Sequence, residues 1–146
     1  MEHRTLTRLS PGEILDGLRT ALLAEQQAVA DYDAHARTSP SPGIAEALEA
    51  LRDVEQQHAQ RLRSRIVALG GSPPRHEAAP QPAGRSLVEL LEHDLGGEQW
   101  AIVEYARLVA GILDDPETAE MMAELLVDEI RHARWLKATL AAQRGG

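Results

Sequence analysis

The chain of 146 residues contains no cysteine and no phenylalanine, and only two tryptophans and two tyrosines. Without cysteine it forms no disulfide, cysteine-held iron–sulfur cluster or thiolate nucleophile, so any metal must be held by oxygen and nitrogen donors. Aromatic and β-branched residues, which favour strands, are scarce beside alanine and leucine, which favour helices. The composition therefore predicts an all-α protein, with one domain over residues 1–146.

Long apolar runs and positive charge are also scarce. No stretch approaches the roughly 20 apolar residues that a membrane-spanning helix needs, and the start of the chain, MEHRTLTRLS, has no apolar segment of signal-peptide length. The net charge of −8 argues against nucleic-acid binding, which requires a basic face, and suits a protein that attracts cations. We therefore expect a cytoplasmic protein with neither a nucleic-acid nor a membrane partner.

Proline and glycine divide the sequence into four helical segments. Breakers at 38–43, 70–85 and 114–116 separate predicted helices over about 12–37, 44–69, 86–113 and 117–142. The short first and third connections predict antiparallel hairpins, whereas the four-proline middle segment is long enough to cross from one hairpin to the other. The expected fold is an antiparallel four-helix bundle with a long crossover between its second and third helices.

Local signals mark several helix positions. Ser86 followed by Glu89 forms a capping-box pattern, and Asp115-Pro116 suits the N-cap and first position of the fourth helix. The pair Gly96-Gly97 lies inside the third helix, at a cost of about 1 kcal/mol per glycine relative to alanine. Such a pair usually has a packing or functional reason, and here it directly precedes a glutamate, Glu98.

The two halves of the chain share a repeat. Residues 24–32 (AEQQAVADY) match residues 97–105 (GEQWAIVEY) at Glu, Gln, Ala and Tyr, and residues 55–59 (EQQHA) match residues 129–133 (EIRHA). Each half thus supplies one glutamate and then, after a similar interval, a Glu-x-x-His motif. Two similar hairpins of this kind imply a bundle with a pseudo-twofold axis.

The apolar seam of each predicted helix is interrupted in its middle by ionisable residues. Steps of three and four along the seams lead to Glu25, to Glu55 with His58, to Glu98, and to Glu129 with His132. The seam of the third helix is expected to continue through Ile102 and Val109. No seam carries a lysine or arginine at this layer.

Four ionised carboxylates in one core layer need partners, because each buried unpaired charge costs several kcal/mol. Two divalent ions would balance four carboxylates, and two neutral imidazoles would complete their ligand sets. Within Glu-x-x-His the side chains project about 60° apart on the helix, so one carboxylate can bridge two metals while its histidine binds one. This motif set is the known pattern of two-metal carboxylate bundles.

The alternative interpretation is that these are ordinary surface glutamates and histidines, with the seam registers one step off. A single Glu-x-x-His is frequent by chance in Glu-rich helices, whereas two of them, matched by two lone glutamates, favour a site. The donor set suits Fe, Mn or Zn, and the residues do not choose among them. Iron is preferred because open positions on a paired-metal site serve O₂ or peroxide chemistry.

Two segments resemble bacterioferritin, a member of the ferritin-like superfamily: residues 91–98 (LEHDLGGE) and residues 121–136 (MMAELLVDEIRHARWL). The similarity extends over nearly all four helices. It implies terminal carboxylates from Glu25 and Glu98, bridging carboxylates from Glu55 and Glu129, and nitrogen donors from His58 and His132. It also places Tyr32 at the position of a redox-active tyrosine, and it implies a homo-oligomer, at least a dimer.

The sequence departs from this family in three places. Gln56 stands where bacterioferritin has its haem-binding methionine, so haem is not expected. Val54, Leu51 and Ala50 replace acidic and histidine residues linked to iron passage. The chain ends at Gly146, before the short fifth helix of ferritin cages, which leaves cage and dimer open.

Two aspartates near the predicted ligands are candidates to support them. Asp128, directly before Glu129, and Asp94, one turn before Glu98, are candidates to accept a hydrogen bond from the outer nitrogen of a ligand histidine, with His58 the expected partner of Asp128. Tyr105 is interpreted as a core tyrosine with a satisfied hydroxyl, Trp100 as a packing residue, and His93 as exposed.

The function expected from these features is that of a ferroxidase, which binds two Fe ions and oxidises Fe(II) with O₂ or H₂O₂. One alternative is a di-iron oxygenase, hydroxylase or peroxidase acting on a small substrate, which an open apolar pocket at the site would favour. Another is a non-catalytic bundle that metal ions stabilise.

Overall fold

The computed structural model describes residues 8–145, and all regular secondary structure within this range is helical. The helices are α1 (Pro11–Thr38), α2 (Pro42–Ala68), α3 (Leu87–Gly111) and α4 (Pro116–Gly145). The predicted four-helix bundle is confirmed, with helix ends within about three residues of those expected. Residues 1–7, which hold most of the polar start of the chain, lie outside the described residues.

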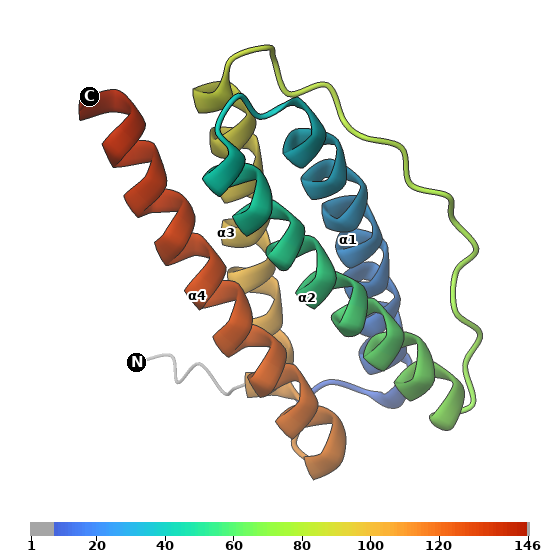
Figure 1. Cartoon of the computed structure of the whole chain (residues 1–146). Coiled ribbons are helices and arrows are strands. Elements are labelled where there is room, and N and C mark those ends of the chain that lie inside the picture. The colour runs from blue at the N-terminus through green and yellow to red at the C-terminus, as the bar shows by residue number, and fades with distance from the viewer. Residues whose placement is uncertain (1–7, 146) are drawn as a thin grey trace, which may run out of the picture.

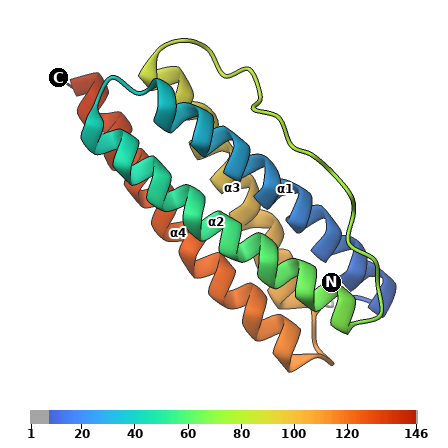
Figure 2. The same ribbon diagram turned by 45° about the vertical axis from the view of Figure 1, so that its right-hand side comes forward.

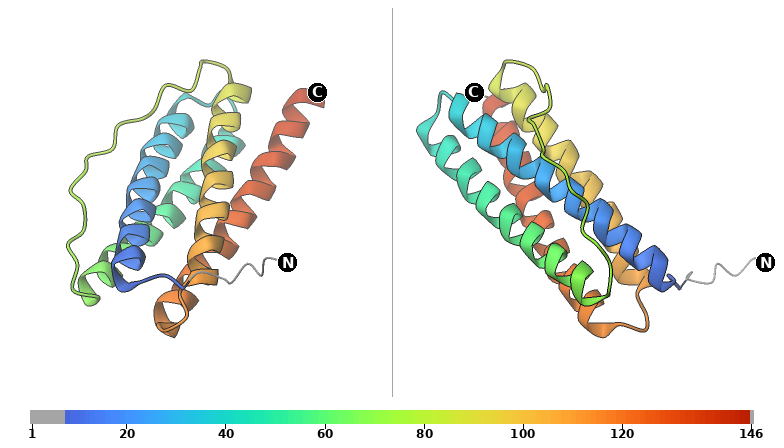
Figure 3. Two further views of the ribbon diagram at one scale, coloured as in Figure 1. Left: turned by 180° about the vertical axis from the view of Figure 1, so that it is seen from behind. Right: turned by 90° about the vertical axis from the view of Figure 1, so that its right-hand side faces the viewer.

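The helices form two hairpins joined by a crossover. α1 packs against α2 and α3 against α4, while α1 and α3 are also neighbours. Each helix runs antiparallel to the helices beside it (Figures 1 and 2). The crossover, residues 69–86, runs along the outside of α1 from one end of the bundle to the other (Figure 3).

Hydrogen bonds attach the crossover to α1 at three points. The bonds run from Arg19 Nε to Ser72 O (3.1 Å), from Gln27 Nε2 to Ala79 O (2.7 Å) and from Gln81 N to Asp31 Oδ1 (2.8 Å). At the start of the crossover Gly70 has a φ of 85°, a left-handed conformation that glycine adopts readily and that commonly ends a helix. The crossover is therefore a strap held against α1 rather than a free loop.

Two apolar clusters fill the core, one on each side of a polar layer. The first includes Leu18, Leu22, Leu62, Leu108 and Met122, with Tyr105 at its edge. The second includes Leu48, Leu91, Leu136 and Leu140, with Tyr32 at its edge. This arrangement explains why each sequence seam is apolar at both ends and ionisable in the middle.

The third seam differs from the expected one. Ala101 and Leu108 are buried on α3, whereas Ile102 and Val109 are only partly buried. The expected seam was therefore shifted by one residue at these two positions. The helix passes through Gly96-Gly97 without a break.

The predicted caps are present. Ser86 Oγ accepts a hydrogen bond from Glu89 N (3.1 Å), and Ser86 N donates to Glu89 Oε1 (3.2 Å). Asp115 Oδ1 accepts from Thr118 N (3.1 Å), directly before the first residue of α4, Pro116. Among the helices within residues 8–145, none is both long and apolar enough to cross a membrane.

We predict that Ser86→Ala lowers the free energy of unfolding by about 1 kcal/mol, because it removes the cap that satisfies the first backbone donors of α3. Urea unfolding followed by circular dichroism measures this change. Ser64→Ala, at an exposed position inside α2, is the matched control and should be neutral or slightly stabilising. Equal losses in the two variants would contradict the role of the cap.

Candidate metal centre

The six ionisable residues predicted from the seams converge in the layer between the two apolar clusters. Their residue exposures range from 1% for Glu25, Glu55 and Glu129 to 6% for His132. One group comprises Glu25, Glu55, His58 and Glu129, and the other Glu55, Glu98, Glu129 and His132. Within each group, one potential ligand atom per residue lies within 4.8 Å of all the others. Glu55 and Glu129 belong to both groups.

Unpartnered polar atoms concentrate in this layer. Among the described residues, the buried side-chain atoms without a hydrogen-bond partner are Glu25 Oε2, Gln26 Oε1, Glu55 Oε1, His58 Nδ1, Glu98 Oε2, Glu129 Oε1 and His132 Nδ1. Each of the six residues contributes one such atom. An unsatisfied buried polar group costs about 1–3 kcal/mol, so an arrangement of this kind fits a site that binds cations.

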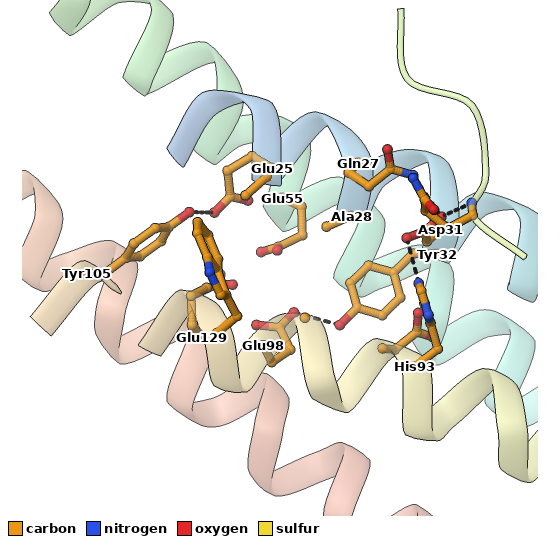
Figure 4. Close-up of a pocket in the computed structure, with 16 residues that line it drawn as sticks. Glu25, Gln27, Ala28, Asp31, Tyr32, Glu55, His93, Glu98, Tyr105 and Glu129 are labelled. Carbon is orange, nitrogen blue, oxygen red and sulfur yellow. Dashed lines mark hydrogen bonds and ion pairs between the residues drawn. The ribbon is translucent and has the colours of Figure 1, made fainter. Parts of the chain in front are cut away.

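Two tyrosines each hold one oxygen of a carboxylate in this layer. Tyr32 donates a hydrogen bond to Glu98 Oε1 (2.6 Å), and Tyr105 donates to Glu25 Oε1 (2.5 Å) (Figure 4). In both glutamates the other oxygen, Oε2, is left unpartnered. Burial and the nearby carboxylates raise the pKa of both tyrosines well above its usual value, which keeps the phenols protonated as donors.

Tyr105 is thus a core tyrosine with a satisfied hydroxyl, as expected, and its partner is one of the predicted ligand glutamates. The repeat indicates this partner, because Tyr105 occupies the position equivalent to Tyr32. The two hydrogen bonds exchange between the hairpins, from α1 to α3 and from α3 to α1. A pseudo-twofold axis that relates the two hairpins produces this exchange.

The two candidate aspartates have different partners. Asp128 Oδ2 lies 2.8 Å from His58 Nε2, the nitrogen opposite the unpartnered Nδ1. Asp94 Oδ2 instead lies 2.8 Å from Nδ1 of His35. Its expected hydrogen bond with a ligand histidine, His58 or His132, is therefore not formed. The position equivalent to Asp128 in the first half is Val54, which offers no carboxylate to His132.

The metal-free layer holds protons. Burial, with Glu25 and Glu98 nearby, raises the pKa of Glu55 well above its usual value, and burial beside Glu25 raises that of Glu129. Burial lowers the pKa of His58, but the nearby carboxylates of Glu129 and Glu25 outweigh it and raise the value to about 10. Without cations, therefore, protons reduce the repulsion between the carboxylates.

Two aromatic residues differ from the sequence-based expectation in how far they are buried. His93, interpreted as exposed, is partly buried, and its Nε2 lies 3.1 Å from Oδ2 of the buried Asp31. Trp100, interpreted as a packing residue, is 45% exposed. Both lie beside a cavity that the sequence did not reveal.

The cavity lies between α1 and α3 and has a volume of about 290 Å³. Glu25, Glu55, Glu98 and Glu129 line its inner part, and Gln27, Asp31 and His93 lie together at another part of its wall (Figure 4). Ala24, Ala28, Gly97, Ala101 and Trp100 add apolar surface. The carboxylate layer is thus in direct contact with a cavity.

Together the bundle and its buried Glu and His side chains define an all-helical carboxylate protein with a candidate two-metal centre. The sequence matches the family model of the ferritin-like domain over residues 15–144. The chain therefore belongs to the ferritin-like family.

Bacterioferritins are distant homologues over most of the chain. The sequence is 31% identical to the bacterioferritin of Brucella melitensis biotype 1 over 133 residues, which cover 88% of this chain and 83% of that protein. The structure resembles bacterioferritin of Rhodobacter capsulatus, with a TM-score of 0.83, 25% identity, and coverage of 96% and 91% of the two chains. It also has the fold of a dodecameric thioferritin from Bacteroides fragilis, with a TM-score of 0.85, 22% identity, and coverage of 94% and 89%.

We predict that the metal-free protein loses stability as the pH rises from 6.5 to about 10. The folded-state pKa of His58 is raised, so its contribution is complete below the unfolded value of about 6.5 and is lost as the pH passes the folded value. The raised pKa values of Glu55 and Glu129 act in the same direction. Urea unfolding in the presence of a chelator measures the slope.

The variant His58→Gln should flatten this slope, whereas His76→Gln, at an exposed histidine in the crossover, should leave it unchanged. Saturating Zn(II) should reverse its sign, because metal binding requires deprotonated ligands. Stability of the metal-free protein that increases over this pH range would contradict the prediction.

Proposed function

We propose that this protein binds two iron ions at the carboxylate layer and oxidises Fe(II) with O₂ or H₂O₂. The observation that carries the proposal is the set of unpartnered buried atoms, one from each of the six predicted ligand residues. Homology to bacterioferritins supports the same reaction. Carboxylate oxygens and imidazole nitrogens also suit Mn and Zn, so iron rests on the homology and on the proposed chemistry.

The two geometric groups suggest how the ligands divide. Glu25 and His58 would hold one ion, and Glu98 and His132 the other. Glu55 and Glu129 belong to both groups, which suits the bridging role. The hydrogen bonds from Tyr32 and Tyr105 hold Oε1 of each terminal carboxylate and leave Oε2 without a partner, so that Oε2 would be available to a metal ion.

Iron is the substrate of the proposed reaction. Two Fe(II) ions lose one electron each, and O₂ takes both electrons with two protons to give H₂O₂, or H₂O₂ takes them with two protons to give two molecules of water. Bound iron supplies redox capacity and open coordination positions. The apolar clusters restrict the access of bulk water to the layer from the two ends of the bundle. Tyr32, hydrogen-bonded to Glu98, is the proposed redox-active tyrosine.

The proposal also covers oligomeric state, cellular location and haem. A homo-oligomer of at least two chains is proposed, since the related Bacteroides fragilis protein is dodecameric. A cytoplasmic location, expected from the sequence, is also part of the proposal. Haem is left out of the proposal, because the exposed amide side chain of Gln56 replaces the family's methionine.

The central test is anaerobic titration with Fe(II), followed by exposure to O₂ and optical detection of Fe(III). Two irons per chain and rapid oxidation are expected. Glu129→Ala should abolish paired binding, because it removes the bridging carboxylate, whereas Glu120→Ala, at an exposed position on the same helix, should have no effect. Saturation at one iron per chain, or unchanged binding in Glu129→Ala, would overturn the site assignment.

The contact between Asp128 and His58 gives a separate prediction. Asp128→Asn should weaken metal binding by about 10- to 100-fold, because a carboxylate on the outer nitrogen orients a ligand imidazole and increases its basicity. Competition titration with a chromogenic Zn(II) chelator measures the affinity. Glu124→Gln, one turn away and exposed, is the control, and equal affinities in the two variants would show that Asp128 does not support the ligand.

The apolar part of the cavity wall favours a second candidate, an oxygenase or peroxidase acting on a small substrate. The side chains of Ala24, Ala28, Ala101 and Trp100 leave room beside the carboxylates. Consumption of O₂ or H₂O₂ in a fixed ratio to an added organic reductant, beyond the Fe(II) supplied, would favour this candidate. Tight Zn binding without Fe(II) oxidation would favour the non-catalytic, metal-stabilised bundle.

A further inference from the structure

The carboxylate layer is flanked differently on its two sides. Towards α2 and α4, His58 is braced by Asp128 at 2.8 Å. Towards α1 and α3 the layer borders the cavity of about 290 Å³. Glu25 and Glu98, which are 1% and 2% exposed, both line this cavity, and each has an unpartnered oxygen. A cation inside the cavity would therefore find carboxylate oxygens without a hydrogen-bond partner at its inner part.

Small residues create the space between the two helices. Ala24 and Ala28 on α1, and Gly97 and Ala101 on α3, all line the cavity. They form two pairs of repeat-equivalent positions, one residue before and three after the glutamates of the repeat. A Cβ added at Gly97 would have no heavy atom within 4 Å. Gly97 therefore borders open space, so a larger side chain there has room to extend into the cavity that this residue lines.

Polar groups surround the part of the cavity beneath the crossover. The buried carboxylate of Asp31 accepts from Gln27 Nε2 (3.1 Å) and Gln81 N (2.8 Å), and its other oxygen faces His93. The His93 side chain is 32% exposed, so it reaches both solvent and the cavity. Among the described residues, the cavity lining contains no lysine or arginine, and nothing positively charged besides histidine opposes a cation there.

We propose that this cavity is the passage through which a divalent cation reaches the metal centre, that Gly97 keeps the passage wide, and that Asp31 and His93 bind the cation first. Asp31 Oδ2 and His93 Nε2 lie 3.1 Å apart, and an oxygen and a nitrogen donor of this kind suit a first-row transition metal. The inference rests on the proposed function, since it takes the carboxylate layer as the destination.

The test separates the rate at which metal arrives from the amount finally bound. Co(II) is mixed anaerobically with the metal-free protein, and its ligand-field absorption is followed by stopped flow and then at equilibrium. Gly97→Leu places a side chain in the passage. Gly96→Leu is the matched control, because Gly96 is its exposed neighbour, lies outside the lining, and also has no heavy atom within 4 Å of an added Cβ.

The Gly97→Leu variant should bind the same final amount of Co(II) as the wild type, with an arrival rate lower by about tenfold or more because the obstruction raises the barrier. Gly96→Leu should keep the wild-type rate. Equal rates in both variants would overturn the passage, whatever the final stoichiometry. Failure of the wild-type protein to bind two ions would instead overturn the proposed function.

A second variant removes the first binding position without narrowing the passage. His93→Gln should slow Co(II) arrival several-fold and leave the final stoichiometry unchanged, whereas His76→Gln, at an exposed histidine of the crossover, should do neither. An unchanged arrival rate in His93→Gln would remove His93 from the proposal. This readout does not depend on oxidation of the metal.

Discussion

Four carboxylates lie in one buried layer of this bundle, and the other features of the centre follow from the need to stabilise them. Burial raises the pKa of Glu55 and Glu129, and no lysine or arginine lies in the seams at this layer. Two tyrosines donate hydrogen bonds to Oε1 of Glu25 and Glu98. One atom of each of the six residues has no hydrogen-bond partner, and the Nδ1 atoms of the two histidines lie only 3.1–3.8 Å from carboxylate oxygens, so these side chains are close enough to share bound cations.

The repeat explains how two similar hairpins build this layer. Equivalent tyrosines donate to equivalent glutamates across α1 and α3, which brings the two copies of the motif face to face. The copies differ in their outer contacts. Asp128 lies against His58, whereas the equivalent position in the first half is Val54, which has no carboxylate. Asp31 faces His93, whereas its equivalent in the second half, Glu104, pairs with Arg107. The inner positions thus keep the symmetry, and the outer contacts differentiate the two halves.

The periodicity of apolar residues was sufficient to predict four helices and to select six residues that the structure brings together, because a helix seam depends only on local spacing. It could not predict the cavity or the pairing of Asp31 with His93, which come from the neighbouring helices α1 and α3 and from a crossover segment with no periodic pattern. The shift of the third seam has the same origin. Ala101 faces the cavity between α1 and α3. Ile102 was the expected core residue because it is large and apolar, but the size of a side chain does not determine which face of α3 is covered by α1.

The crossover determines that α1 and α3 are the neighbours. α2 and α3 run parallel, so the chain must return along the whole bundle before α3 begins. The 27-residue α2 is about 40 Å long at 1.5 Å per residue, and residues 69–86 can span about 60 Å when extended, so the segment is long enough for the return. A short turn would instead make α2 and α3 antiparallel, and Glu25 and Glu98 would no longer face each other across the tyrosine exchange. The bonds from Gln27 and Asp31 to the strap therefore join the connection that sets the topology to the cavity beside the metal centre.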